Sequence, residues 1–272
     1  MTDIPGQLKP TMTPEAGFRR VAKMCCDAFA LHLAQVMAEE NPEGPHRARV
    51  ALRRLRSALA GFSPVIEPAA RREMAGQARV LFRSLGRLRD ADVLLAGCVD
   101  PGAVAGLSAA ADRTRAEVRV EMTALQADRF APRLLARLQG TDWQRSSKRG
   151  RRWQRRGLDR LGRRALRQAW QACVDHGPDL TTLAPAPRHE LRKDLKTLRY
   201  LSEYFAPFWP GGRRDRFLAH LRSLQDSLGA LNDLVLARVL DAGPMPTQAE
   251  ADMLATAGQS WTALLKTGPW WD

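Results

Sequence analysis

The same spacing of basic residues occurs twice in this sequence. Residues 46–94 align with residues 189–237 without a gap, and 15 of the 49 aligned positions are identical. A repeat of this length predicts a chain made of two similar halves. Cations at matching positions further predict that the halves build one site together. The repeated sets are His46, Arg49, Arg53 and Arg56 in the first copy and His189, Arg192, Lys196 and Arg199 in the second.

Helix signals run through the chain, whereas alternating apolar and polar residues do not persist. Thr13, Pro14 and Glu15, for example, combine an N-cap residue, a proline at the first helical position and an acid in the first turn. The sequence therefore predicts an all-α fold with two pseudo-symmetric helical bundles of about four helices each. We expect helices at residues 14–40, 45–62, 67–96, 104–127, 132–139, 154–175, 188–205, 213–240 and 248–266.

The repeat also divides the chain. We expect one domain over residues 13–267, in which a half at 13–140 and a half at 154–267 are joined by a basic linker at 141–153. Residues 145–167 hold eleven basic residues and one acid. We expect a flexible link up to residue 152. The arginines that recur at helical spacing after residue 155 form either a second cationic stripe or a solvated helix face.

The charge and the cysteines limit the class of protein. A formal net charge of +14 and a pI near 10.8 indicate a polyanionic partner, such as nucleic acid, an anionic membrane surface or a phosphate polymer. The four cysteines have no metal-ligand or disulfide spacing, which predicts reduced, buried thiols. No apolar stretch approaches the roughly 20 residues that span a bilayer, so we expect a cytoplasmic protein without a membrane segment. We expect no cofactor and no bound metal.

On a helix, the spacing of each repeated set places its members within an arc of roughly 80°. The first set therefore forms one stripe, beside an apolar stripe of leucines and Phe62 that would pack the helix against the protein. Residues 44–66 contain no acid, and we expect each copy to be an acid-free cationic stripe beside a leucine stripe. The alternative is a solvated helix face, but such a face normally carries acids one turn from its cations.

Other repeated positions lie on the helix that follows each stripe. Arg79 and Arg222 recur there and, with Arg83, would add to the cationic lining. Gly86 and Gly229 also recur, within helical patterns where glycine costs about 1 kcal/mol relative to alanine. Close helix packing or a kink would offset this cost.

The two repeated histidines each lie in the first turn of a cationic helix, where free N–H groups and the helix dipole favour an anion. A bound phosphate would favour the protonated imidazole. Asp90 and Asp233 recur as well, and we expect them to orient nearby arginines. A metal site is a weaker interpretation, since no acid or cysteine stands at ligand spacing from His46.

Four stretches carry a resemblance to a known family. HRARVALRRLRSALAGF with SLGRLRDADVLLA, and HELRKDLKTLRYLSEYF with LQDSLGALNDLVLA, resemble the CHAD family, the conserved histidine α-helical domain. The resemblance covers about residues 13–266. It implies two pseudo-symmetric helical bundles with a basic central cavity, and binding of inorganic polyphosphate by the repeated histidine and basic positions. Some family members carry a triphosphate-hydrolysing tunnel domain, but this chain has no ExExK motif, so that activity is not implied.

The sequence thus predicts a non-enzymatic module that holds linear polyphosphate by bidentate arginine contacts. Binding of an RNA or DNA backbone is the alternative, although no aromatic residues lie between the cations to stack on bases. A third hypothesis is a metal-dependent phosphohydrolase that uses the two histidines. We expect sulfate or phosphate ions at the site in crystals, and a protein that lies in the cytoplasm or on polyphosphate granules. The Trp270-Trp271 tail would pack on the core or meet a partner.

Overall fold

The computed structural model describes residues 8–98, 100–240 and 247–271, with their side chains except those of residues 232–240 and 247. In this part of the chain there are ten α-helices and no strand, apart from an isolated bridge between Ile66 and Gln144. The predicted all-α class is therefore confirmed. The chain forms two compact units, Met12–Arg156 and Gly157–Asp272 with Met1–Thr11. The predicted basic cavity shared by both halves stays a prediction.

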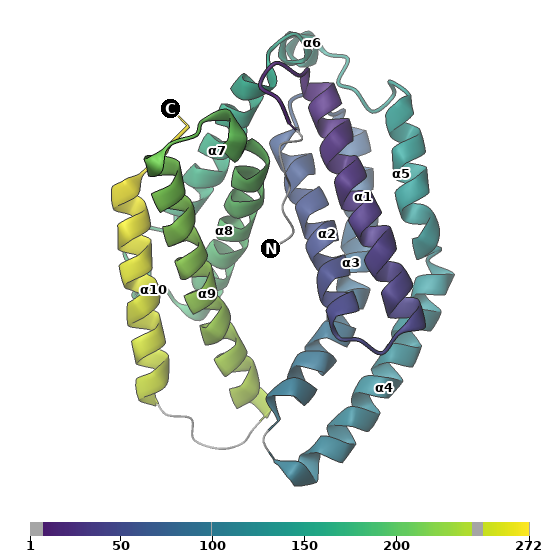
Figure 1. Cartoon of the computed structure of the whole chain (residues 1–272), viewed down its shortest axis with the longest axis vertical. Helices are drawn as coiled ribbons and strands as arrows, with labels where there is room; N and C mark the ends of the chain where they lie inside the picture. The colour runs from purple at the N-terminus through teal and green to yellow at the C-terminus, as the bar shows by residue number, and fades with distance from the viewer. Residues whose placement is uncertain (1–7, 99, 241–246, 272) are drawn as a thin grey trace. The chain divides into compact units, whose positions relative to one another are not determined.

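The described part of the first unit contains six α-helices, of which α1 packs on α2 and α5, and α3 packs on α2 and α4 (Figure 1). Its core includes the Phe18 ring, which lies 5.5 Å from the Phe62 ring and 5.3 Å from the Trp143 ring, centre to centre. The helices are α1 (Pro14–Ala38), α2 (Glu43–Gly61), α3 (Pro68–Gly97), α4 (Pro101–Ala124), α5 (Phe130–Gln139) and α6 (Lys148–Gln154).

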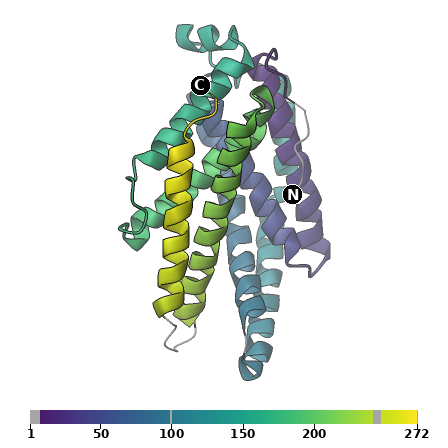
Figure 2. The same cartoon turned by 60° about the vertical axis from the view of Figure 1, so that its left-hand side comes forward.

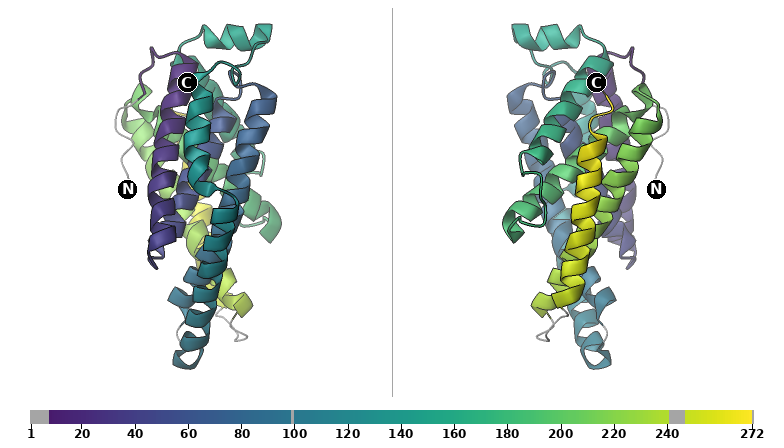
Figure 3. Two further views of the ribbon diagram at one scale, coloured as in Figure 1. Left: turned by 90° about the vertical axis from the view of Figure 1, so that its right-hand side faces the viewer. Right: turned by 90° about the vertical axis from the view of Figure 1, so that its left-hand side faces the viewer.

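In the described part of the second unit there are four α-helices, which pack in the same sequential order, α7 on α8, α8 on α9 and α9 on α10 (Figures 2 and 3). These helices are α7 (Leu158–Val174), α8 (Pro185–Phe205), α9 (Gly212–Leu240) and α10 (Thr247–Thr267). In both units the helix that carries the repeated cations therefore packs on the helix that carries the repeated glycine. The leucine stripes do the packing: Leu52 and Leu55 on α2, and Leu195 and Leu198 on α8, are buried.

The segment expected to be a flexible link contains a helix instead. α6 begins after Ser147, whose Oγ accepts a hydrogen bond from the Gly150 amide at 3.1 Å. Just before it, the chain is paired with the α2–α3 loop, because the Glu67 amide donates to the Trp143 carbonyl at 2.8 Å and the Arg145 amide donates to the Val65 carbonyl at 2.9 Å. These long-range bonds order a segment whose composition alone indicates a linker.

The C-terminal tail packs on the core of the second unit. Trp271 is fully buried and its ring lies 5.6 Å from the Phe217 ring, while the Trp270 ring lies 6.0 Å from that of Trp209. Of the two roles considered for the tail, the structure shows core packing.

α1 passes a length-and-composition test for a membrane span, contrary to the expectation that no stretch would come close. It is the one helix among the described residues that passes, and its most apolar 18-residue window has a mean hydropathy of 1.2. The same helix packs on α2 and α5 and buries Phe18, Val21 and Phe29. One such helix is weak evidence for a membrane span, because a buried core helix and an N-terminal signal sequence both pass the same test.

Candidate functional site

Three arginines of the first stripe surround one aromatic ring. The Cζ atoms of Arg49, Arg53 and Arg56 lie 4.1, 5.0 and 5.7 Å from the centre of the Phe82 ring on α3. Arg49 also donates from Nη1 to the Phe82 carbonyl oxygen at 3.0 Å. A cation over an aromatic face is attracted by the ring quadrupole. Phe82 therefore gathers the positive charge of α2 at the contact between α2 and α3.

Gly86 makes room for Arg49. A Cβ atom at position 86 would lie 2.3 Å from Nη1 of Arg49, which is far inside a van der Waals contact. Of the two reasons expected for this glycine, a close contact between helices fits: α3 has no side chain at the place where the Arg49 guanidinium group of α2 lies. At the aligned position Gly229 a Cβ atom would meet nothing within 4 Å, so the second unit has no such contact.

Arg79 and Arg83, which were expected to add to the first stripe, lie close enough to it to affect Arg56. Burial lowers the pKa of Arg56, and the neighbouring charges of Arg79, Arg53 and Arg83 lower it further. Burial likewise lowers the pKa of Arg49 to about 10, opposed by Asp90. These electrostatic effects link the five arginines in one cluster, and the charge of Asp90 acts on Arg49. The orienting role expected of Asp90 stays a prediction, and the side chain of Asp233 lies outside the described residues. We name the cluster of Arg49, Arg53, Arg56, Arg79 and Arg83 the α2–α3 face.

His46 lies at one end of this face. It is exposed in the first turns of α2. Glu43, one residue outside the acid-free stretch, accepts a hydrogen bond from Nε of Arg47 at 2.9 Å. This bond, and then the charges of His46, Arg47 and Arg89, lower the pKa of Glu43. The start of α2 therefore combines a histidine with an ionised acid, and the purely cationic surface begins after it.

The second stripe, on α8, differs from the first. Arg199 donates from Nε to Glu203 at 2.9 Å and from Nη1 to Gln225 at 3.1 Å. Gln225 is buried and donates to the Leu195 carbonyl at 2.7 Å. Gln225 occupies the position that aligns with Phe82. The expectation of an acid-free second stripe is therefore wrong at Glu203, because this acid, one helical turn from Arg199, neutralises it.

The other members of the second set lie along the same helix. His189 is exposed, and Arg192 and Lys196 are partly buried. Burial lowers the pKa of His189, and the charges of Lys193, Arg192 and Lys196 lower it further, against Glu190. Arg222 is exposed on α9, but the position aligned with Arg83 is Asp226. The second stripe is thus less basic than the first.

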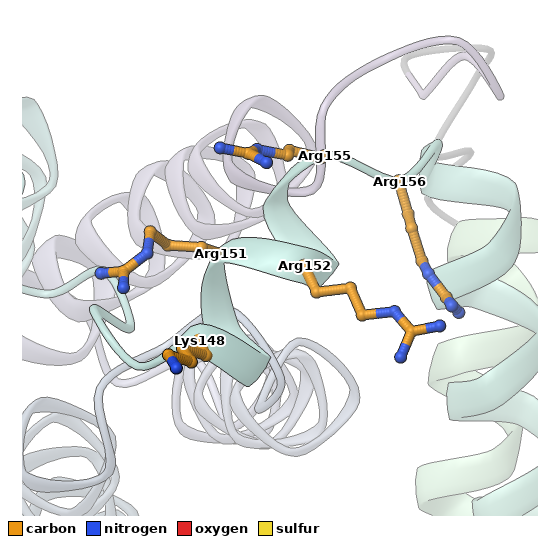
Figure 4. A pocket seen from close by; sticks show the side chains of 5 residues that line it. All are labelled: Lys148, Arg151, Arg152, Arg155 and Arg156. Carbon is orange, nitrogen blue, oxygen red and sulfur yellow. The ribbon is translucent and has the colours of Figure 1, made fainter.

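Basic side chains also gather at α6, where Lys148, Arg151, Arg152, Arg155 and Arg156 line a cavity of about 370 Å³ (Figure 4). The high density of positive charge is visible in the sequence. The helix is not, because a polar helix of seven residues has no apolar periodicity that would predict it. Among the described residues, no group of three or more His, Cys, Asp or Glu side chains could hold a metal ion.

Comparisons with known proteins agree with this architecture. A family model described as the CHAD domain matches residues 20–240. The crystal structure of the CHAD domain from the plant Ricinus communis superposes with a TM-score of 0.70 at 22% identity, covering 97% of this chain and 90% of that chain. PptA from Streptomyces chartreusis superposes with a TM-score of 0.52 at 17% identity, covering 95% and 96%. At these identities the two likenesses show the fold. None of the curated proteins compared matches this chain.

Proposed function

Because the chain belongs to the CHAD domain family, which is associated with polyphosphate binding, we propose that it binds inorganic polyphosphate and that the α2–α3 face is its main contact surface. The second stripe, on α8, contributes fewer unneutralised cations. The proposed activity is binding without catalysis, in the cytoplasm or on polyphosphate granules.

The observation that carries this proposal is the crowding of cations at the α2–α3 face. Within the described residues no carboxylate lies within ion-pair distance of Arg53, Arg79 or Arg83. Mutual repulsion between such neighbours is relieved when an anion binds among them. Guanidinium groups also offer paired N–H donors that match phosphate oxygens. A chain of phosphates carries a negative charge on each unit, so it suits a surface on which several guanidinium groups lie close together.

The ring contacts favour phosphate over bases. Phe82 is the aromatic residue at this face, and three guanidinium groups already lie over its ring. A single-stranded nucleic acid gains much of its affinity from bases that stack on free aromatic faces. The α2–α3 face thus presents phosphate donors without a stacking platform, which supports polyphosphate over the nucleic-acid alternative.

The proposal is tested with a triple variant, Arg53→Gln, Arg79→Gln and Arg83→Gln, which leaves Arg49 in its structural contact. The matched control replaces three exposed arginines of the same unit, Arg72, Arg113 and Arg129, with glutamine. We expect the first variant to bind long-chain polyphosphate at least about tenfold more weakly, and its log–log salt slope to fall by about 2 to 3, from the release of about 0.7–0.9 counterions per contact. The control should resemble the wild type.

Two results would overturn the proposal. One is equal binding by the triple variant and the wild type, provided that circular dichroism shows both to be folded. The other is efficient displacement of long-chain polyphosphate by RNA or DNA at matched phosphate concentration, which would favour the nucleic-acid alternative.

A further inference from the structure

The basic surface of α6 is separate from the α2–α3 face and differs from it in construction. Five cations line a cavity of about 370 Å³, and no acid is among the lining residues. Figure 4 shows the five side chains extending from one short helix and the residues that follow it. The lining residues are Lys148, Arg151, Arg152, Arg155 and Arg156. We name them the α6 cluster.

The backbone that carries the α6 cluster is held firmly. Gly150 is buried, and a Cβ atom there would lie 2.4 Å from the Arg145 carbonyl oxygen, so the helix approaches the preceding chain more closely than any other residue type allows. The same carbonyl accepts a hydrogen bond from Nε2 of Gln154 at 3.2 Å. Gly150 and Gln154 of α6 therefore both lie against Arg145, and these contacts position the backbone that carries the cluster.

No described acid neutralises the charges of the α6 cluster. In the described part of the chain, none of the five has a carboxylate within ion-pair distance. Arg151 donates to the Ser146 carbonyl, which is neutral, and the Arg156 Cζ lies 4.7 Å from the centre of the Trp153 ring. Exposed helix cations that serve solubility usually alternate with acids. Five such cations around one cavity instead suit a ligand with several negative charges.

We propose that the α6 cluster is a second binding site for the phosphate polymer, used together with the α2–α3 face by long chains. The ligand class rests on the proposed function. Phosphate is favoured over single-stranded nucleic acid here as well, because Arg156 lies over the Trp153 ring and the described residues that line the cavity include no aromatic side chain on which a base could stack.

The connection between the two sites supports their joint use. The chain just before α6 is paired with the loop that joins α2 to α3, through the bridge of Ile66 with Gln144. Both sites therefore belong to one unit and are joined by a short, hydrogen-bonded segment. A ligand that reaches both sites gains affinity from the second contact without a second loss of translational freedom. Long polyphosphate should gain in this way, whereas triphosphate occupies one site at a time.

The test replaces the four exposed members, Lys148, Arg151, Arg152 and Arg155, with glutamine and keeps Arg156 on Trp153. Glutamine has a helix propensity similar to that of lysine and arginine, so the fold is retained. The matched control replaces four exposed arginines outside both sites, Arg72, Arg113, Arg129 and Arg133, with glutamine. Binding of long-chain polyphosphate and of triphosphate is measured by calorimetry at several salt concentrations.

We expect the α6 variant to bind long chains about tenfold more weakly than the control, with a salt slope smaller by about 3. We also expect it to bind one triphosphate fewer per chain. An affinity, slope and stoichiometry equal to those of the control overturn the second site while leaving the proposed function intact. If the wild type binds neither long-chain polyphosphate nor triphosphate, the proposed function fails, and the second site fails with it.

Discussion

Replacing Gly86 with alanine tests whether α3 is shaped around Arg49. In a helix interior this substitution normally stabilises a protein by up to about 1 kcal/mol. Here the new Cβ atom would meet Nη1 of Arg49 at 2.3 Å, so the guanidinium group must leave its position. Arg49 would lose a charged hydrogen bond to the Phe82 carbonyl, which contributes about 1.5–3 kcal/mol. It would also lose the contact with the Phe82 ring, which contributes about 0.5–1 kcal/mol.

Complete loss of both contacts, less the propensity gain of up to about 1 kcal/mol, gives a net destabilisation of about 1–4 kcal/mol for Gly86→Ala, and a smaller shift of the flexible guanidinium group gives less. The chain contains its own control, because Gly229 aligns with Gly86 and has open space where a Cβ atom would lie. Gly229→Ala should therefore stabilise the protein by up to about 1 kcal/mol. Urea unfolding followed by far-ultraviolet circular dichroism measures both free energies, and the denaturant slope should stay constant.

A double-mutant cycle isolates the cause. In an Arg49→Met background the clash is absent, so Gly86→Ala should become stabilising, as at Gly229. Two results would contradict this role of Arg49: a stabilisation by Gly86→Ala in the wild type as large as that by Gly229→Ala, or a cost of Gly86→Ala that persists in the Arg49→Met background. The first result would mean that the guanidinium group moves aside without loss. The second would place the cost elsewhere on α3.

Three further predictions concern the second unit and the thiols. Glu203→Gln removes the acid that neutralises Arg199, so polyphosphate affinity should rise about two- to fivefold; an unchanged affinity would contradict this. Burial and neighbouring cations lower the pKa of His189, and a bound anion raises it again, so binding takes up a proton. Affinity should therefore increase as the pH falls from about 8 to about 6, and this increase should shrink in His189→Gln; an identical pH profile would exclude the role. Burial raises the pKa of Cys26 to about 12, so a thiol reagent at about pH 8 should modify the half-buried Cys98 first, as peptide mapping would show; equal rates would contradict it.

The helices could be predicted because their signals are local. Proline and N-cap residues mark where α1 begins, and leucines at helical spacing mark the buried side of α2 and α8. The neutralisation of Arg199 could also have been predicted, since Glu203 lies one turn away on the same helix. Aligning the two copies identifies only the positions that they share, whereas the acids of α8 are positions at which the copies differ.

The all-α class, the order of the helices and the two cationic stripes could be predicted from the sequence alone, because helical periodicity is a property of neighbouring residues. The contacts that each stripe makes depend on the tertiary structure. Phe82 gathers three guanidinium groups and Gln225 binds one, a difference that arises where a second helix packs on the first. α6 likewise forms where bonds to the Val65–Glu67 segment hold a polar chain in place. Contacts between residues distant in the chain depend on packing, and no local pattern in the sequence records them.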